Sequence, residues 1–149
     1  MAVKTPEQFI ESLRKLKPCV YMFGKKVENP VDHPRLRAGI NATAATYALA
    51  NDERFRERFT TLSPLTGERV NRFTLPPASI EDLVLRVKNN RTLGGFVGTC
   101  HQRCTGLDCL CALSIVTYDI DKKYGTSYNA RFLDFLKYMQ NNDLAANAG

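Results

Sequence analysis

The sequence lacks the features of a membrane or secreted protein. None of its apolar runs approaches the ~20 residues that a membrane-spanning helix needs, and the N-terminus has no secretion signal. Internal repeats, low-complexity tracts and linkers are missing too. With 44% hydrophobic and 24% charged residues among 149, the composition is that of a chain that buries a core. We therefore predict one domain over residues 1–149, in a soluble, cytoplasmic protein.

Clusters of basic charge are also lacking. Lys and Arg number 21 against 15 Asp and Glu, which gives a net charge of +6, but no basic run is longer than two residues. Nucleic-acid-binding proteins usually gather such residues on one face, so we expect no nucleic-acid partner, and no membrane partner either. A basic surface that attracts a phosphorylated ligand, such as a nucleotide or a coenzyme A thioester, explains the same balance.

Two common catalytic motifs are absent. The chain has no elbow-type motif around a serine or cysteine nucleophile, and Gly94, Gly95 and Gly98 do not form a phosphate-binding loop between a strand and a helix. We interpret Gly94-Gly95 as a junction between helices.

The hydrophobic periodicity predicts a mainly α fold with one or two small β-hairpins. We expect a first helix of about three turns that starts at Pro6. Further helices are expected over residues 36–50, from a Ser79 cap to Gly94, over about 98–123 and over about 129–140, and hairpins are expected near residues 19–27 and 60–73. The last helix is expected to bury Phe132, Phe135, Leu136 and Met139.

The cysteines carry the strongest chemical signal. Four of the five, Cys100, Cys104, Cys109 and Cys111, lie close together, whereas a disulfide framework would spread them, so we expect a reduced compartment with metal or redox chemistry. On a helix over residues 98–123, the sulfurs of Cys100 and Cys104 would project from one face and could hold a metal centre. Cys111 falls near that face and Cys109 roughly opposite.

The kind of centre stays open on spacing alone. Structural zinc usually takes two Cys-x2-Cys pairs, and an iron–sulfur cluster commonly needs four protein ligands. The alternative is that these cysteines pack as small apolar side chains. His101 is about 100° from Cys100 around the predicted helix, which makes it a poor third ligand. His33, beside Asp32 in a proline-flanked loop, could orient a ligand, but such a pair more often stabilises the loop.

A string of motifs covers nearly the whole chain: Glu11-Ser-Leu-Arg-Lys-Leu-Lys-Pro18, Val20-Tyr-Met-Phe-Gly24, Val27-Glu-Asn29, Val31-Asp-His-Pro34, Ile40-Asn41, Cys100-His-Gln-Arg-Cys104, Asp121-Lys-Lys-Tyr-Gly125 and Phe135-Leu-Lys-Tyr138. In this order they resemble the N-terminal domain of the 4-hydroxybutyryl-CoA dehydratase/vinylacetyl-CoA isomerase family, which belongs with the 4-hydroxyphenylacetate 3-hydroxylase flavoproteins.

The resemblance implies the N-terminal helical domain of an acyl-CoA-dehydrogenase-like fold. In the family it is followed by a β-rich middle domain and a C-terminal helical domain, in homotetramers that bind FAD and, in the dehydratase branch, a [4Fe–4S] cluster. It implies that Cys100 and Cys104 are cluster ligands, that a histidine and a cysteine from later domains complete the set, and that Gln102 lies near the active site as a catalytic candidate. The implied reaction converts 4-hydroxybutyryl-CoA to crotonyl-CoA by a ketyl-radical route.

By the same resemblance, the FAD-binding middle domain and the C-terminal domain are absent from residues 1–149. We therefore expect that the chain alone binds neither cofactor fully and is inactive, and that its partners are the remaining domains or a complementary subunit, in a homo-oligomer that acts on an acyl-CoA substrate. Cys109 and Cys111 are not expected from the family. Two alternatives are a flavin monooxygenase of the 4-hydroxyphenylacetate 3-hydroxylase type, which needs no cluster, and a non-catalytic helical assembly module.

Overall fold

The computed structural model describes residues 3–147. Within this range the chain forms six α-helices, one short 3₁₀ helix and two antiparallel hairpins, which confirms the mainly α fold. The elements are α1 (Pro6–Leu16), β1 (Val20–Met22), β2 (Lys25–Val27), α2 (Pro34–Asn51), α3 (Arg56–Phe59), β3 (Thr60–Leu62), β4 (Arg69–Asn71), η1 (Arg72–Thr74), α4 (Ile80–Val97), α5 (Arg103–Tyr124) and α6 (Tyr128–Asn141). None of these helices is both long and apolar enough to cross a membrane.

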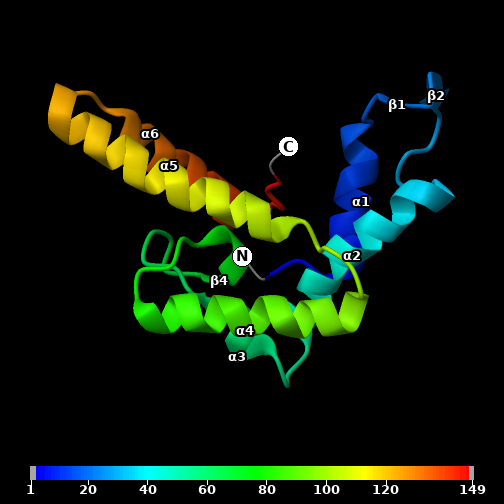
Figure 1. Ribbon diagram of the computed structural model, residues 1–149, viewed down its shortest axis with the longest axis horizontal. Helices are drawn as coiled ribbons and strands as arrows, with labels where there is room; N and C mark the ends of the chain where they lie inside the picture. Colours follow the sequence, from blue (N-terminus) through cyan, green and yellow to red (C-terminus); the bar gives the residue numbers. More distant parts are fainter. Residues whose placement is uncertain (1–2, 148–149) are drawn as a thin grey trace.

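The long helices lie in two groups. Figure 1 shows α5 and α6 side by side as an antiparallel pair, while α1 and α2 lie with the β1–β2 hairpin at the other end of the molecule. The hairpins pair Val20 with Val27 and Thr60 with Asn71. Helix α2 contacts α1, α3 and α4, so it connects the two groups.

Local signals set several of the helix ends. Thr5 and Gln8 form a capping box at the start of α1, and the Ser79 side chain accepts from the backbone N–H of Asp82 at the start of α4, as the sequence predicted. Gly98 and Gly125, with φ of 62° and 66°, end α4 and α5 in the left-handed conformation that glycine adopts without strain.

Three apolar clusters form the core. The largest joins α2, α3, η1, α4 and α5 through Leu49, Ala50, Phe59, Phe73, Leu93 and Leu107. A second joins α5 and α6 through Leu110, Phe132, Leu136 and Met139. In the third, α1 packs on α2, with the rings of Phe9 and Tyr47 stacked at 4.7 Å between centroids. The site described below lies where α2, α5 and the chain after α6 meet.

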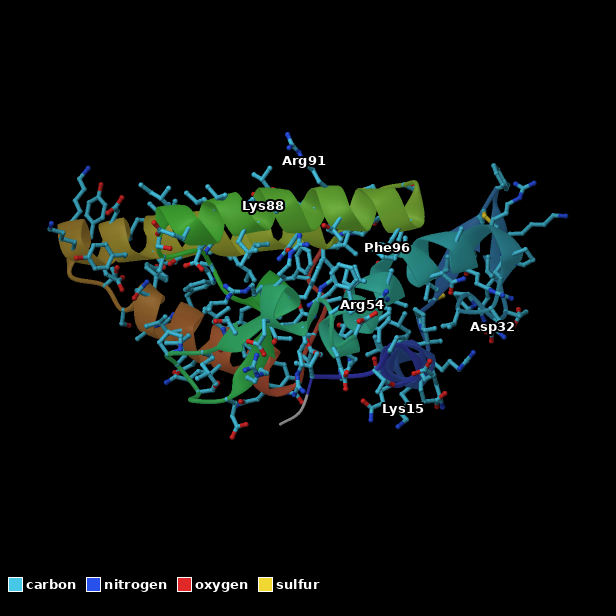
Figure 2. All side chains as sticks on the ribbon, turned by 90° about the horizontal axis from the view of Figure 1, so that it is seen from below. Lys15, Asp32, Arg54, Lys88, Arg91 and Phe96 are labelled. Carbon is cyan, nitrogen blue, oxygen red and sulfur yellow. The ribbon has the colours of Figure 1, made fainter. Side chains whose placement is uncertain are left out.

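The predicted junction at Gly94-Gly95 is wrong, because α4 runs through both glycines to Val97. Two helical glycines cost roughly 1 kcal/mol each, and the packing of Leu93 in the largest cluster and of the buried Asn89 offsets this cost. The N-terminal half of α4 does not pack inward: Ile80, Leu83, Val84 and Val87 are exposed. Figure 2 shows Arg91, one turn after Val87, pointing away from the molecule on this outward side.

Two other expectations need correction. The helix predicted over 98–123 begins only at Arg103, because Gln102 has a φ of 66° and residues 98–102 are not helical. Phe135 was predicted to be buried, but its side chain is 49% exposed, since α6 packs on α5 along the face of Phe132, Leu136 and Met139 only.

Candidate functional site

The two predicted metal ligands lie on either side of the start of α5. Cys100 precedes the helix and is exposed, whereas Cys104 is in its first turn and half-buried. The prediction that both lie on one helix is therefore wrong, yet the two thiols lie close enough for Cys100 to raise the pKa of Cys104. The backbone N–H of Gln102 also donates to Cys100 Sγ at 3.4 Å. The left-handed residue Gln102 thus turns the chain so that Cys100 folds back toward Cys104.

The environment of Cys104 disfavours its charged form. Burial, together with the charge and hydrogen bond of the neighbouring Cys100, raises the pKa of the Cys104 thiol above its usual value. A thiol of this kind binds a metal with loss of its proton, since the thiolate is the ligand. We therefore call Cys100 and Cys104 the thiol pair.

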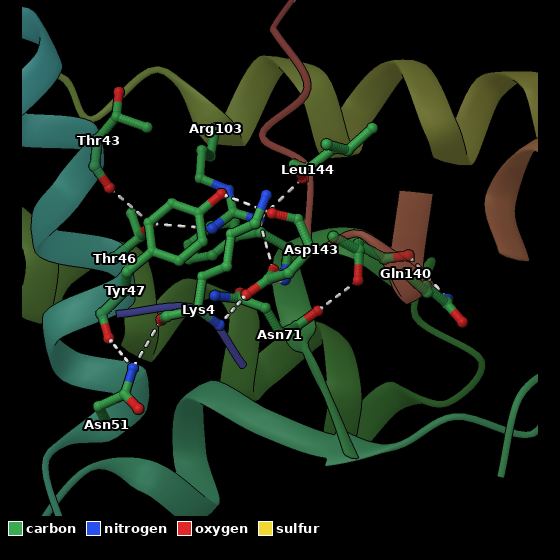
Figure 3. A network of polar contacts seen from close by, with 12 residues as sticks. Lys4, Thr43, Thr46, Tyr47, Asn51, Asn71, Arg103, Gln140, Asp143 and Leu144 are labelled. Atoms are coloured by element: carbon green, nitrogen blue, oxygen red, sulfur yellow. Dashed lines mark hydrogen bonds and ion pairs between the residues drawn. The ribbon is translucent and has the colours of Figure 1, made fainter. Parts of the chain in front are cut away.

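Arg103, between the site residues, anchors the start of α5 in the core. Its side chain is 1% exposed and its guanidinium lies 4.6 Å from the ring centroid of Tyr47. It donates to Thr46 Oγ1 (3.0 Å) and to the carbonyl oxygen of Leu144 (3.3 Å), and lies 3.9 Å from the Asp143 carboxylate. Figure 3 shows this network joining α2 to the chain after α6.

Tyr47 and Asp143, two further members of the network, are buried as well. The Tyr47 hydroxyl donates to the backbone carbonyl of Asp143 (3.0 Å), and the backbone N–H of Lys4 donates to the Asp143 carboxylate (2.9 Å). Burial raises the pKa of Tyr47 to about 12. Burial also raises the pKa of Asp143, although the Arg103 charge opposes this shift. The polar network therefore holds both chain ends against α2.

Gln102 is exposed, and its side chain belongs to a second, smaller network. Asn147 Nδ2 donates to Gln102 Oε1 (2.8 Å), and Thr105 Oγ1 donates to Asn147 Oδ1 (2.8 Å). Next to it, the Cα of Gly106 faces the backbone of Ala146 so closely that a Cβ at this position would overlap the Ala146 carbonyl. Asn147 and Gly106 were not identified from the sequence as part of this site. For Gly106, a glycine inside a helical pattern was the available signal of a close backbone approach.

Neither histidine adds a ligand to the thiol pair. His101 is buried with its ring 5.1 Å from that of Phe73, and burial and the Arg103 charge lower the pKa of His101. His33 caps α2 by accepting from the backbone N–H of Arg35 (3.3 Å), and its neighbour Asp32 accepts from Arg14. The Asp32–His33 pair therefore stabilises a loop and a helix start.

The remaining cysteines lie apart from the pair. Cys109 is exposed, and Cys111 packs half-buried against the largest core cluster, where burial raises its thiol pKa. Cys111 follows Cys104 by seven residues on α5 and so lies near the same helix face, about two turns further along. Among residues 3–147, no three His, Cys, Asp or Glu side chains gather as a metal site. This part of the chain thus offers two thiol donors.

A groove of about 840 Å³ borders the site. Gln102 and Arg103 line it together with apolar residues of α1 and α2, such as Leu13 and Ile40, and with the chain at Ala145–Asn147. Gln102, which lies between the two cysteines in the sequence, is therefore open to an approaching molecule or polypeptide segment.

The structure is thus a mainly helical domain that presents Cys100 before the first turn of α5 and Cys104 within it. Residues 5–149 match the family model described as the 4-hydroxyphenylacetate 3-hydroxylase N terminal. The chain belongs to this family, and its fold is that of the family's acyl-CoA-dehydrogenase-like N-terminal helical domain.

Two dehydratases resemble the chain along almost its entire length. It is 51% identical over 140 residues to the 4-hydroxybutyryl-CoA dehydratase/vinylacetyl-CoA-Delta-isomerase of Clostridium aminobutyricum, which covers 94% of this chain and 29% of that protein. The structure of the oxygen-tolerant archaeal 4-hydroxybutyryl-CoA dehydratase from N. maritimus matches with a TM-score of 0.91 and 45% identity, over 97% of this chain and 28% of that one.

The oxygenase branch is similar at lower identity. The oxygenase component HpaB of 4-hydroxyphenylacetate 3-monooxygenase, solved in complex with FAD, matches with a TM-score of 0.71 and 26% identity, over 95% of this chain and 29% of that one. The chain thus spans less than a third of the length of the relatives it matches.

Proposed function

We propose that this chain is the N-terminal domain of a 4-hydroxybutyryl-CoA dehydratase/vinylacetyl-CoA isomerase, as a domain or as a separate subunit. The observation that carries the proposal is the proximity of the thiol pair at the start of α5, in a chain 51% identical to such a dehydratase. The 4-hydroxybutyryl-CoA substrate, the FAD and the [4Fe–4S] cluster belong to the complete enzyme.

The thiol pair fits half of a cluster site. Iron–sulfur clusters are held by thiolates, and hydrogen bonds to the sulfurs tune them; here the two thiols lie close together and the Gln102 N–H already donates to Cys100. Since no third candidate ligand lies with the pair in the described part of the chain, the other two ligands must come from further polypeptide. When bound, the cluster supplies a Lewis acid for the departing hydroxyl and the flavin exchanges an electron and a proton.

In this proposal the chain's own residues bind the cluster and hold the ligands in place. Cys100 and Cys104 give up their protons to become ligands, and Arg103 fixes the turn of α5 that carries Cys104. Gln102 offers its amide beside the pair as the catalytic candidate. Because the flavin site and half of the ligands lie elsewhere, the chain alone is inactive.

The test is anaerobic reconstitution of the assembly that contains this chain, followed by iron analysis and cluster spectroscopy. Cys100→Ser and Cys104→Ser are expected to lose most of the bound iron and the dehydration of 4-hydroxybutyryl-CoA. Cys109→Ser, an exposed cysteine on the same helix, is the matched control and should keep both. Unchanged iron content in Cys100→Ser would rule the assignment out.

A flavin monooxygenase is the second candidate, favoured by the match to HpaB. It predicts aerobic hydroxylation of 4-hydroxyphenylacetate with reduced flavin by the same assembly, with no dependence on Cys100 or Cys104. Absence of this activity together with bound iron would separate the two enzymes.

A non-catalytic assembly module is the third candidate. The exposed apolar residues of α4 and α5, such as Ile80, Val84 and Ile115, favour it. It predicts that the purified chain associates with itself, which light scattering measures.

A further inference from the structure

A residue near the far end of the chain sets the orientation of the Gln102 amide. Asn147 Nδ2 donates to Gln102 Oε1, and Thr105 Oγ1 donates to Asn147 Oδ1, each at 2.8 Å. A side-chain amide has one acceptor end and one donor end. Thr105 Oγ1, which also donates to the Gln102 backbone carbonyl oxygen at 3.0 Å, faces the acceptor end of Asn147, so the donor end of Asn147 faces Gln102 and the donor end of Gln102 is left over.

The end left over is a donor. Gln102 Oε1 is occupied by Asn147, and within residues 3–147 no oxygen accepts from Gln102 Nε2. This NH₂ group lies on the residue whose backbone N–H donates to Cys100 Sγ. The exposed donor therefore belongs to a residue that lies between the two cysteines in the sequence and contacts Cys100 through its backbone.

The segment that carries Asn147 is anchored in the core. This segment, residues 143–147, receives the Arg103 guanidinium at the Leu144 carbonyl (3.3 Å). Ala146 packs against Gly106 so closely that no side chain fits between them. The buried arginine between Gln102 and Cys104 thus fixes the segment whose Asn147 reaches back to Gln102.

We propose that Asn147 is a positioning residue that holds the Gln102 amide with its NH₂ group outward, so that Gln102 donates a hydrogen bond to a carbonyl or hydroxyl oxygen of the substrate. The inference rests on the proposed function for the identity of that substrate. It goes beyond it by giving Gln102 a polarity and by assigning that polarity to Asn147 and Thr105. Asn147 itself does not touch the substrate.

The orientation can be measured on this chain directly by NMR, through scalar coupling across the hydrogen bond between two side-chain amides. We expect coupling from the Asn147 side-chain nitrogen to the Gln102 side-chain carbonyl carbon. Coupling in the opposite sense, from the Gln102 nitrogen to the Asn147 carbonyl carbon, would mean that both amides are flipped and would overturn the proposal. So would the absence of coupling in either sense while other amide couplings are observed.

The consequence is tested in the reconstituted assembly with Asn147→Asp, which replaces the Nδ2 donor by an acceptor and forces Gln102 to turn its NH₂ group inward. Loss of one hydrogen bond to the substrate should lower kcat/KM about tenfold, with iron content and thermal midpoint unchanged. Asn142→Asp, the same change five residues earlier, where the side chain donates only to the Tyr138 carbonyl, is the matched control. In Gln102→Leu, adding Asn147→Asp should cost nothing more.

The results separate the two proposals. If Asn147→Asp turns over substrate as fast as Asn142→Asp in an iron-loaded, active assembly, the positioning role is wrong and the proposed function stands. If Asn147→Asp adds its full loss to that of Gln102→Leu, the role is also wrong, because the two residues then act separately. If the expected coupling is found but the assembly holds no cluster, the amide orientation stands and the proposed function fails.

Discussion

Arg103 is a fully buried charge whose partners all lie outside α5. Removing it leaves the buried Asp143 carboxylate without its cation, and breaking such a pair is costly because the remaining charge stays desolvated. We expect Arg103→Met to lower the free energy of unfolding by about 3 kcal/mol, measured by urea denaturation at pH 7. Arg131→Met, at an exposed arginine over the Tyr128 ring, is the control and should change it little.

A second substitution, at Asp143, tests whether the loss of stability comes from the unpaired carboxylate. Asp143→Asn removes the orphaned charge, so the double variant Arg103→Met/Asp143→Asn should recover part of the loss. Equal or greater destabilisation in the double variant would show that the loss in Arg103→Met comes from packing against Tyr47 and Phe73 rather than from the unpaired carboxylate.

Gly106 is the second residue whose role is set by a close approach. A Cβ there would overlap the Ala146 backbone, whereas at Gly94, also inside a helix, a Cβ meets nothing within 4 Å. We expect Gly106→Ala to destabilise by about 2 kcal/mol, a typical cost of overpacking. Gly94→Ala should be neutral or stabilise by up to about 1 kcal/mol, since alanine is the better helix former. Thermal unfolding of both variants checks the contrast, and equal effects would contradict it.

At the scale of elements, one carboxylate joins two helices. Asp121, near the end of α5, accepts from the backbone N–H groups of Tyr128 and Asn129 (both 2.8 Å) and from Thr126 Oγ1 (2.6 Å). The cap residue of α6, Ser127, makes no side-chain cap of its own. Asp121 therefore caps α6 from the preceding helix and fixes the α5–α6 connection.

The cap predicts a pH dependence of stability. Burial alone would raise the pKa of Asp121, but the hydrogen bonds from Thr126, Asn129 and Tyr128 outweigh it and lower the pKa. A carboxyl with a lower pKa in the folded state stabilises the fold above its unfolded pKa, and this stabilisation is lost as the pH falls through the folded pKa. We expect Asp121→Ala to lower the thermal midpoint clearly at pH 7 and progressively less as the pH falls toward 3.

The matched control is Asp119→Ala, an exposed carboxylate two residues earlier on α5 that caps nothing. It should leave the midpoint nearly unchanged at both pH values. A constant difference between Asp121→Ala and the parent from pH 7 to pH 3 would show that the carboxylate charge is not what stabilises α6.

The elements were predictable where the signal is local, and the site was predictable only in part. The Thr5 and Ser79 caps and the αL glycines mark helix ends through bonds to neighbouring residues, so the sequence contains them. The break before Arg103 does not follow from local signals, because a left-handed Gln102 is unfavourable on its own and is stabilised by the burial of His101 and Arg103 on either side. The pairing of Cys100 with Cys104 was therefore anticipated for the wrong geometric reason.

The contact between the segment after α6 and the site could not be predicted from the sequence either, because it is not local. Asn147 contacts Gln102 across 45 residues of sequence, and neither spacing nor composition relates the two. Likewise, the apolar spacing of Ile80, Leu83, Val84 and Val87 correctly predicted a helix, but it could not show that this face lies outward. Periodicity indicates which residues share a face and leaves open what covers it.

At the scale of the whole molecule, apolar side chains on two helices remain uncovered. Ile80, Leu83, Val84 and Val87 form an apolar face on α4, and the outer half of α5 exposes Leu113, Ile115, Val116 and Tyr118 around the helix. Apolar patches of this kind mark interaction sites or drive association. Since the chain spans less than a third of its relatives' length, both further polypeptide and a second copy of the chain are suitable covers.

The α4 face predicts that the purified chain associates at micromolar and higher concentration. Val84→Lys/Val87→Glu places a charge pair three residues apart on this face without changing the net charge, and should shift the mass measured by light scattering toward that of one chain. The thermal midpoint of the fold should change little, because both side chains are already about half exposed. Glu81→Lys/Lys88→Glu, a charge exchange at exposed positions of the same helix, should leave association unchanged. A parent chain that stays monomeric at every concentration would show that the α4 face does not drive self-association, and would count against the assembly-module alternative. If Val84→Lys/Val87→Glu instead weakens the complete assembly, further polypeptide covers this face.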